Sequence, residues 1–267
     1  MDLQLKGKRA IVTGGSRGIG KAVARVLAEE GASVALLARD AARLAAAASE
    51  LSAATGARVV GVAADTTQDA AVQAAAEEAA RQLGGAIDIL VNAAAEPAGF
   101  AAPPKLGEIE SAYFHAELDT KVMGYIRCAR AVVPGMRANG WGRIVNISGL
   151  AARQTGNTVG SMRNVAVAAL TKNMADELGP AGIQVTVVHP GLTRTERTAP
   201  LVAARAKASG RAEAEIEAEM AAMNSIRHLV TAEEVAWVVV FLCSPRSRAL
   251  NGDVIAAGGG APRTIHY

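Results

Sequence analysis

The chain has 267 residues, of which 51% are hydrophobic and 20% are charged, and its formal net charge at pH 7 is +3. Because this apolar content is sufficient for a buried core, the composition excludes a chain that is disordered throughout. Lysine and arginine number 28 against 25 acidic residues, and this near balance does not favour a nucleic-acid partner. The length fits one domain over residues 1–267.

The first residues lack the apolar segment of a signal peptide, and charge or glycine interrupts every long apolar stretch before about 18 residues. We therefore expect a cytoplasmic protein with no membrane partner. The two cysteines, Cys128 and Cys243, have no neighbours at metal-ligand spacing, so we expect buried free thiols and no metal site.

Short β-branched segments alternate with longer alanine-rich segments of helical periodicity along the chain. The strand-like segments are 9–13, 33–38, 58–64, 87–92, 143–148, 184–189 and 253–257. Helical periodicity is clearest over 18–30, 68–83 and 165–178. This alternation predicts an α/β protein, a parallel sheet with helices on both faces, whose binding site lies at the carboxyl ends of the strands.

Two further segments are expected near that edge of the sheet. Residues 196–224 follow a Pro-Gly turn and show helical spacing, and they could form a mobile lid. Thr231 then begins a Thr-Ala-Glu-Glu capping box for the last long helix. The proline-containing loop 93–107 is expected to hang over the same edge, where loops commonly control substrate access.

A glycine-rich loop follows the first predicted strand and opens directly into a helix. Residues 13–20 read Thr-Gly-Gly-Ser-Arg-Gly-Ile-Gly. Glycines allow the sharp turn and the close approach of backbone to a pyrophosphate, whose charge is then stabilised by the helix N-terminus. The position between strand and helix makes this a predicted dinucleotide site.

The end of the second strand suggests which dinucleotide is bound. Arg39 stands where NAD-binding sites usually carry an acid, and with Arg17 it could pair the 2′-phosphate of NADP. We interpret Asp40 as a helix cap rather than a ribose ligand. The alternative is that both arginines are solvated surface residues.

The sequence resembles the short-chain dehydrogenase/reductase family over essentially its whole length. The motifs that carry the resemblance are the TGxxxGxG loop at 13–20, Asp65 after the third strand, the NNAG variant at 92–95, the strand 142–148, the Pro-Gly pair at 190–191 before Thr195, and the closing segments 251–254 and 258–260. The resemblance implies a single-domain Rossmann fold with a doubly wound, seven-stranded parallel sheet.

The resemblance also implies which residues bind the cofactor and how the chain assembles. The expected NADP-binding residues are Gly14, Ser16, Arg17, Gly18, Ile19, Gly20, Arg39, Asp65, Thr66, Asn92, Ala93, Asn164, Pro190, Gly191, Thr193 and Thr195. In the family, helices equivalent to 121–137 and 165–178 pack across a two-fold axis. We therefore expect a homodimer or homotetramer.

The catalytic motif of the family, YxxxK, has no match here. Counting back from residues 170–172 places Gly160 at the tyrosine and Asn164 at the lysine, whereas counting forward from the fifth strand places the tyrosine at 161 or 162. Residues 149–175 contain no tyrosine, and their only lysine, Lys172, lies too far along the helix. We interpret the chain as a divergent member that lacks the pair.

Lys121 is the candidate to replace the missing tyrosine–lysine pair, because the resemblance places it where the family has a catalytic asparagine. Its ammonium could act as the general acid/base, with Ser148 and Asn164 as the other catalytic candidates. The register leaves open whether Ser148 or Gly149 holds the family's serine position. Arg163 is close enough in sequence to bind an acidic substrate. The alternative is that Lys121 fills space or points to solvent.

The predicted function is an NADP(H)-dependent oxidoreductase that acts on a small carbonyl or hydroxyl substrate through an atypical acid/base site. Two other functions remain open on these residues. One is a non-redox enzyme on the same scaffold, such as a lyase, hydratase or isomerase. The other is a catalytically silent dinucleotide-binding protein, since fold resemblance does not choose among chemistries.

Overall fold

The strands of the computed structural model, which describes residues 1–95 and 102–262, form one seven-stranded sheet in the order β3-β2-β1-β4-β5-β6-β7. Neighbouring strands all pair in parallel. The strands are β1 Arg9–Thr13, β2 Ser33–Ala38, β3 Val59–Ala63, β4 Ile89–Asn92, β5 Gly142–Ile147, β6 Ile183–Pro190 and β7 Val254–Ala257. The predicted doubly wound sheet is confirmed, with some strands shorter than expected by one or two residues.

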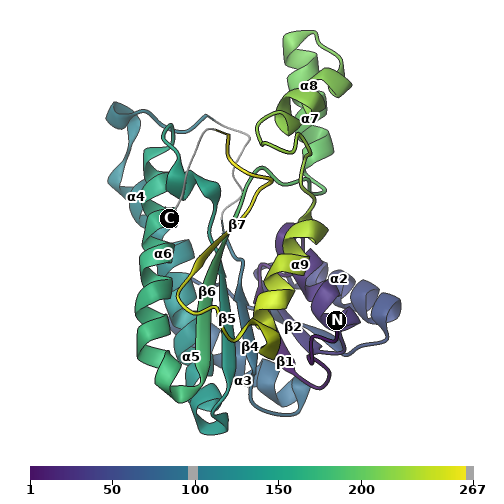
Figure 1. Cartoon of the computed structure of the whole chain (residues 1–267), viewed down its shortest axis with the longest axis vertical. Helices are drawn as coiled ribbons and strands as arrows, with labels where there is room; N and C mark the ends of the chain where they lie inside the picture. Colours follow the sequence, from purple (N-terminus) through teal and green to yellow (C-terminus); the bar gives the residue numbers. More distant parts are fainter. Residues whose placement is uncertain (96–101, 263–267) are drawn as a thin grey trace.

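Helices cover both faces of the sheet (Figure 1). They are α1 Gly18–Glu29, α2 Ala41–Thr55, α3 Asp69–Leu83, α4 Ser111–Leu118, α5 Gly124–Asn139, α6 Thr158–Leu178, α7 Thr198–Ser209, α8 Glu213–Ala221 and α9 Ala232–Cys243. Helices α1, α2 and α9 pack on one face, and α3, α5 and α6 pack on the other. Helix α6 begins seven residues before the predicted 165–178 segment because Asn157 caps it.

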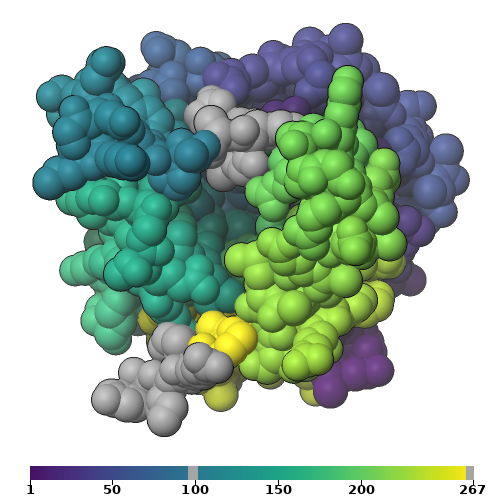
Figure 2. Space-filling view, turned by 90° about the horizontal axis from the view of Figure 1, so that it is seen from above, coloured from purple at the N-terminus to yellow at the C-terminus, as the bar shows by residue number. Residues whose placement is uncertain are grey.

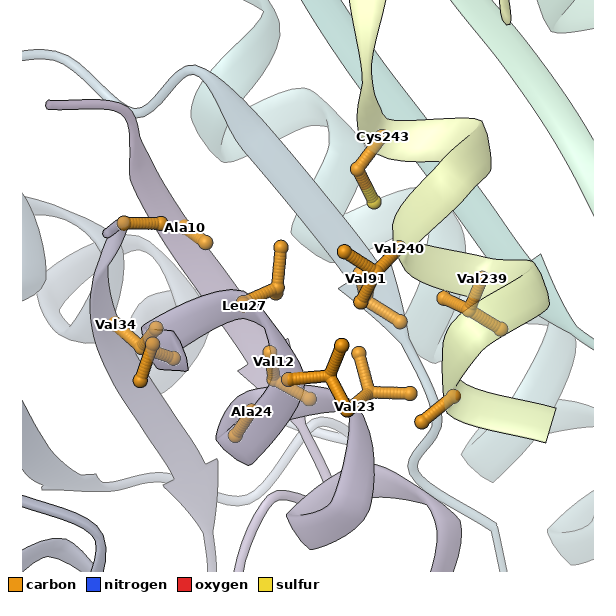
Figure 3. Close-up of a cluster of buried hydrophobic side chains, with 14 of the residues drawn as sticks. Ala10, Val12, Val23, Ala24, Leu27, Val34, Val91, Val239, Val240 and Cys243 are labelled. Atoms are coloured by element: carbon orange, nitrogen blue, oxygen red, sulfur yellow. The ribbon is translucent and has the colours of Figure 1, made fainter. Parts of the chain in front are cut away.

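The core lies on both sides of the sheet because strand residues alternate between its faces. Leu36 of β2 belongs to the cluster under α1 and α9, whereas its neighbour Leu37 belongs to the cluster under α3 and α5. Figure 3 shows the first cluster, in which side chains of α1 and α9 gather against strands β1, β2 and β4. This burial on both faces explains the continuous apolar runs of the strands.

Helices α7 and α8 stand beyond the carboxyl ends of the strands (Figure 1). Their buried residues form a separate small cluster, which includes Val202, Ile216 and Met220.

The predicted capping box before α9 is confirmed. The Glu234 amide donates to Thr231 Oγ1 at 3.2 Å, and Glu234 Oε2 accepts from the Thr231 amide at 2.7 Å. Part of the predicted loop 93–107 lies outside the described residues.

In the portion of the chain that the structure describes, no helix combines the length and apolarity needed to cross a lipid bilayer.

The strand order reverses between β1 and β4, which both continue at their carboxyl ends into loops. In open α/β sheets a crevice forms at such a point. The fold therefore places the glycine-rich loop and the ends of β4, β5 and β6 around one site.

Candidate functional site

A cleft of about 690 Å³ opens at the carboxyl ends of the strands. Figure 2 shows it from above as a hollow between the green α7–α8 segment and the teal segments opposite. The predicted cofactor residues that line the cleft are Gly14, Ser16, Arg17, Gly18, Ile19, Gly20, Arg39, Asp65, Thr66, Ala93, Asn164, Pro190, Gly191, Thr193 and Thr195. Lys121 and Ser148 line the same cleft.

Asn92 is the predicted cofactor residue that the structure does not bring to the cleft. Its side chain is fully buried, and its Nδ2 donates to Asn146 Oδ1 at 2.9 Å. The backbone after it is held instead by Thr13, whose Oγ1 accepts from the amides of Ala93 and Ala94 at 3.0 and 3.1 Å. Asn92 therefore ties β4 to β5 beneath the site rather than lining it.

The glycine-rich loop has the backbone geometry of a phosphate cradle. A Cβ on Gly20 would lie 2.4 Å from the carbonyl oxygen of Gly14, and a Cβ on Gly14, whose φ is +66°, would lie 2.9 Å from the carbonyl oxygen of Ala93. Only glycine fits such close backbone approaches. The glycines therefore let the loop pack tightly against its own backbone and against the segment after β4, at the edge of the cleft.

An anion already occupies the start of α1. Both carboxylate oxygens of Glu196 accept from the amide of Gly18, at 3.0 and 3.2 Å. A helix N-terminus carries partial positive charge and free N–H groups, which is why it binds carboxylates and phosphates alike. The residues present thus fit the phosphates of a dinucleotide, and Glu196 marks the position where they would bind.

Asp65, another residue expected to bind the cofactor, also lines the cleft. Asp65 Oδ1 accepts from the amide and the hydroxyl of Thr67, both at 2.9 Å. The hydrogen bond from the backbone amide of Thr67, together with the charges of Arg39 and Arg127, keeps the pKa of Asp65 below its usual range. Asp40 caps α2 by accepting from the amide of Arg43 at 2.9 Å, which confirms its predicted role.

Lys121 is buried in the cleft rather than exposed to solvent. It lies on a π-helical turn, η2 Asp119–Met123, between α4 and α5, and 4% of its surface is exposed. Its Nζ donates to the carbonyl oxygen of Ser148 at 2.9 Å and to Oδ1 of Asn164 at 3.1 Å. Burial, with the charge of Arg163, lowers the pKa of Lys121 to about 7.

Ser148 and Gly149 share the end of β5. The Ser148 hydroxyl donates to the backbone carbonyl of Asn164 at 3.0 Å, so it ties the strand to α6. A Cβ on Gly149 would lie 3.0 Å from Nδ2 of Asn164. Gly149 is therefore the position that faces the Asn164 amide, and Ser148 supplies the carbonyl that binds Lys121.

The wall beside Gly160 is filled by a residue that sequence reasoning missed. A Cβ on Gly160 would lie 2.6 Å from Nδ2 of Asn157. Asn157 caps α6, and its Oδ1 accepts from the amide of Gly160 at 2.8 Å. The preference of asparagine for the N-cap position was the signal that could have identified it.

An ion pair between Glu117 of α4 and Arg163 of α6 lies next to Lys121. Arg163 lines the cleft, and 12% of each side chain is exposed. Glu117 was not anticipated, because only the fold brings α4 to α6. His189 is buried nearby with Nδ1 unpartnered, and burial with the charges of Arg153 and Lys121 lowers its pKa to about 4.

Three further side chains, those of one tyrosine and two cysteines, are buried. The hydroxyl of Tyr125 donates to the carbonyl oxygen of Ile147 at 2.8 Å, so this residue links α5 to the end of β5. Cys128 and Cys243 are buried free thiols. Within residues 1–95 and 102–262 no three His, Cys, Asp or Glu side chains cluster closely enough to hold a metal ion.

Residues 14–262 match a family model described as enoyl-(acyl carrier protein) reductase. The chain is 35% identical over 254 residues to the short-chain reductase protein NovJ of Streptomyces niveus. This alignment covers 95% of this chain and 93% of NovJ. It is 34% identical over 256 residues to cis-4-hydroxycyclohexanecarboxylate dehydrogenase of Sinomonas cyclohexanicum, covering 94% and 95% of the two chains. The structure of L-sorbose reductase of Gluconobacter frateurii, solved with NADPH and L-sorbose, aligns with a TM-score of 0.91 at 32% identity. The alignment covers 99% of this chain and 100% of the reductase.

Proposed function

The chain belongs to the short-chain dehydrogenase/reductase family of nicotinamide-dependent oxidoreductases, and from this premise we propose that it interconverts a small carbonyl compound and its alcohol with NADP(H), using Lys121 as the acid/base group. One observation carries the proposal: the ammonium of Lys121 is buried in the cleft, where Ser148 and Asn164 hold it by hydrogen bonds. The relative from Sinomonas cyclohexanicum and the reductase from Gluconobacter frateurii are named for small hydroxy and keto compounds, which supports a small-molecule substrate.

The proposal treats the chain as a member without the tyrosine–lysine pair of the family. Gly160 and Asn164 take those two positions in the alignment that counts back along α6. The side chain of Asn157 occupies the space beside Gly160, and a larger residue at this position would have to displace it. Among the described residues that line the cleft, Lys121 is the one that carries an ammonium.

NADPH, when bound, supplies the hydride that reduces the carbonyl carbon. Lys121 donates a proton from Nζ to the carbonyl oxygen as negative charge develops there, and the resulting neutral amine regains a proton from water. In the oxidative direction the neutral amine accepts the hydroxyl proton instead. Asn164 and the carbonyl of Ser148 hold Nζ in place, because each accepts one of its N–H groups and leaves the third for the substrate.

We assign cofactor preference to Arg17 and Arg39, which both line the cleft. The charge of Arg39 acts on Asp65, another expected cofactor-binding residue that lines the same cleft. A guanidinium forms charge-assisted hydrogen bonds with a 2′-phosphate that a ribose hydroxyl cannot match. We therefore propose NADP(H) rather than NAD(H).

We also propose that residues 196–224 act as a lid. The segment begins at Glu196, contains α7 and α8, and forms its own small apolar cluster at the mouth of the cleft. Because this cluster is separate from the main core, the segment can move without disrupting the sheet. Closure would exclude water from the reacting atoms.

We propose a homodimer or homotetramer built on α5 and α6. The α6 residues Met162 and Val165 are each 51% exposed, and Met123 beside α5 is 37% exposed. Large apolar side chains left exposed on neighbouring helices favour a covered interface. Light scattering at micromolar concentration should report a mass of two or four chains, and a monomer would refute this assembly.

The function is tested by isotope transfer. The protein is incubated with NADPH deuterated at the transferable position and a panel of ketones, which includes L-sorbose and 4-oxocyclohexanecarboxylate. Mass spectrometry should find deuterium on the new carbinol carbon of at least one product. Conversion without deuterium would indicate a non-redox reaction, and no conversion across the panel would count against the proposed activity.

A further inference from the structure

The buried ammonium of Lys121 lacks an anionic partner. Its two hydrogen-bond acceptors are a backbone carbonyl and a neutral amide, and no carboxylate within the described residues forms an ion pair with it. A buried charge is stable only when it is paired or well solvated by polar groups. When Lys121 is protonated, the inner end of the cleft, which is the part around Lys121, Ser148 and Asn164, therefore contains a cation that no carboxylate of the described residues pairs with.

The neighbouring charges add to this imbalance. Glu117 of α4 and Arg163 of α6 act electrostatically on Lys121. Lys121 acts in turn on His189 of β6, on which Arg153 of the short helix η3 Leu150–Arg153 also acts. His189 is neutral near pH 7, since its pKa is lowered to about 4. Apart from the neutral His189, one carboxylate therefore stands beside two cations, Arg163 and the protonated Lys121.

Arg163 has donors to spare. Its Nη1 pairs with Glu117, whereas its Nε is buried without a partner. A guanidinium carries five N–H donors, and one carboxylate satisfies two of them at most. The side chain lines the cleft one residue before Asn164, which contacts Lys121.

We propose that the substrate carries a carboxylate, which binds Arg163 at the inner end of the cleft while its carbonyl group faces Lys121. The inference rests on the proposed function, because it concerns the substrate of that same site. The carboxylate would supply the negative charge that the site lacks. Its charge would also favour the protonated form of Lys121, the form that can donate a proton to a carbonyl oxygen. Arg163 is then the residue that determines specificity for acids.

The test uses matched pairs of oxo acids and their amides, which differ only in charge: 4-oxopentanoate with 4-oxopentanamide, and 5-oxohexanoate with 5-oxohexanamide. Calorimetry measures their binding to the chain of 267 residues saturated with NADP+. The acids should bind about tenfold or more tightly than the amides, as one charge-assisted contact would give. Equal affinities, or no binding by either acid, would overturn the proposal.

Two substitutions should act in opposite directions. Arg163→Gln should remove the preference for acids and leave amide binding unchanged. Arg163→Lys, which keeps the positive charge, should retain part of the preference for acids. Glu117→Gln should instead strengthen acid binding several-fold, because it frees donors of Arg163 and removes a competing carboxylate. Arg58→Gln, at an exposed arginine far along the chain, is the matched control and should change neither. If Arg163→Gln fails to fold, as thermal unfolding would show, the result with Glu117→Gln decides.

Free acetate distinguishes a substrate carboxylate from a separate anion. If acetate makes the amides bind as tightly as the acids, the anion is not part of the substrate and the proposal is wrong. The readouts also separate this inference from the proposed function. Acids that bind through Arg163 but consume no NADPH would reject the redox activity alone, whereas NADPH-dependent reduction with no preference for acids would reject the inference alone.

Discussion

Nζ of Lys121 lies 3.1 Å from Oδ1 of Asn164, so that an amide on α6 holds an ammonium that comes from the turn between α4 and α5. The amide oxygen can accept from the ammonium, but it cannot neutralise its charge. Lys121 is therefore held in a position where it can exchange a proton, with a pKa lowered to about 7. Catalytic acids and bases work best with pKa values near the operating pH.

Replacing Lys121 with methionine should lower kcat by about 10²–10⁴-fold, the usual contribution of general acid/base catalysis. Methionine keeps much of the length and apolar volume of the lysine stem, so folding and NADP(H) binding should persist. Lys172→Met is the matched control, because Lys172 is 60% exposed and pairs with Asp176 on the outer side of α6. Normal turnover by the Lys121→Met protein would show that water or the substrate supplies the proton.

The rate of carbonyl reduction should fall as pH rises through about 7, because Lys121 loses the proton that it must donate. The rate of alcohol oxidation should instead rise with pH through about 7, because oxidation requires the neutral amine of Lys121. A profile of kcat/KM reports the free enzyme and is the relevant measurement. The Lys121→Met protein should lack this ionisation, and an unchanged profile would assign it to another group.

The free energy of unfolding should increase with pH between about 7 and 10.5. In that interval the unfolded chain keeps Lys121 protonated, whereas the folded chain has lost the proton, because burial lowers its pKa from 10.5 to about 7. The unfolded state binds more protons, so stability rises with pH. Urea unfolding at several pH values should show this slope in the wild type and a smaller one in Lys121→Met. Identical slopes would contradict the buried, uncompensated ammonium.

Arg39→Ala should reduce the preference for NADP(H) over NAD(H) by about tenfold or more, because a charge-assisted contact to phosphate contributes about 1.5–3 kcal/mol. Calorimetric titration with both cofactors measures the ratio. Arg25→Ala provides the control, since Arg25 pairs with Glu29 on the exposed side of α1. A wild-type protein that binds both cofactors equally would reject the assignment.

Glu196→Gln should strengthen NADP(H) binding by about two- to fivefold. The carboxylate of Glu196 occupies the amide of Gly18 at the start of α1, and a charge at a helix N-terminus contributes about 0.3–1 kcal/mol. A neutral amide would compete less with the cofactor phosphates. Glu213→Gln, on the exposed start of α8, should leave cofactor affinity unchanged. Weaker binding by Glu196→Gln would show that the carboxylate supports the site instead.

Most of the sheet and of the cofactor cleft could be read from the chain, because both depend on local patterns. Apolar strands such as Ser33–Ala38 are recognisable from their composition, and the glycines at 14, 18 and 20 reveal a turn that backbone geometry allows few other residues to form. The capping roles of Asp40 and Thr231 follow from side-chain bonds that span three residues. The bond of the Asn92 side chain to Asn146 could not be read in this way, because a strand-end position does not reveal to which side the side chain turns.

The inner end of the cleft depends on contacts between residues far apart in the chain. Lys121 and Asn164 are 43 residues apart, and Glu117 and Arg163 are 46 apart. Neither the burial of Lys121 nor the carboxylate beside Arg163 could be read from a periodic pattern, because a pKa and a charge balance depend on every group that surrounds a side chain. Those surroundings form only when α4, the π-helical turn and α6 pack over the end of β5.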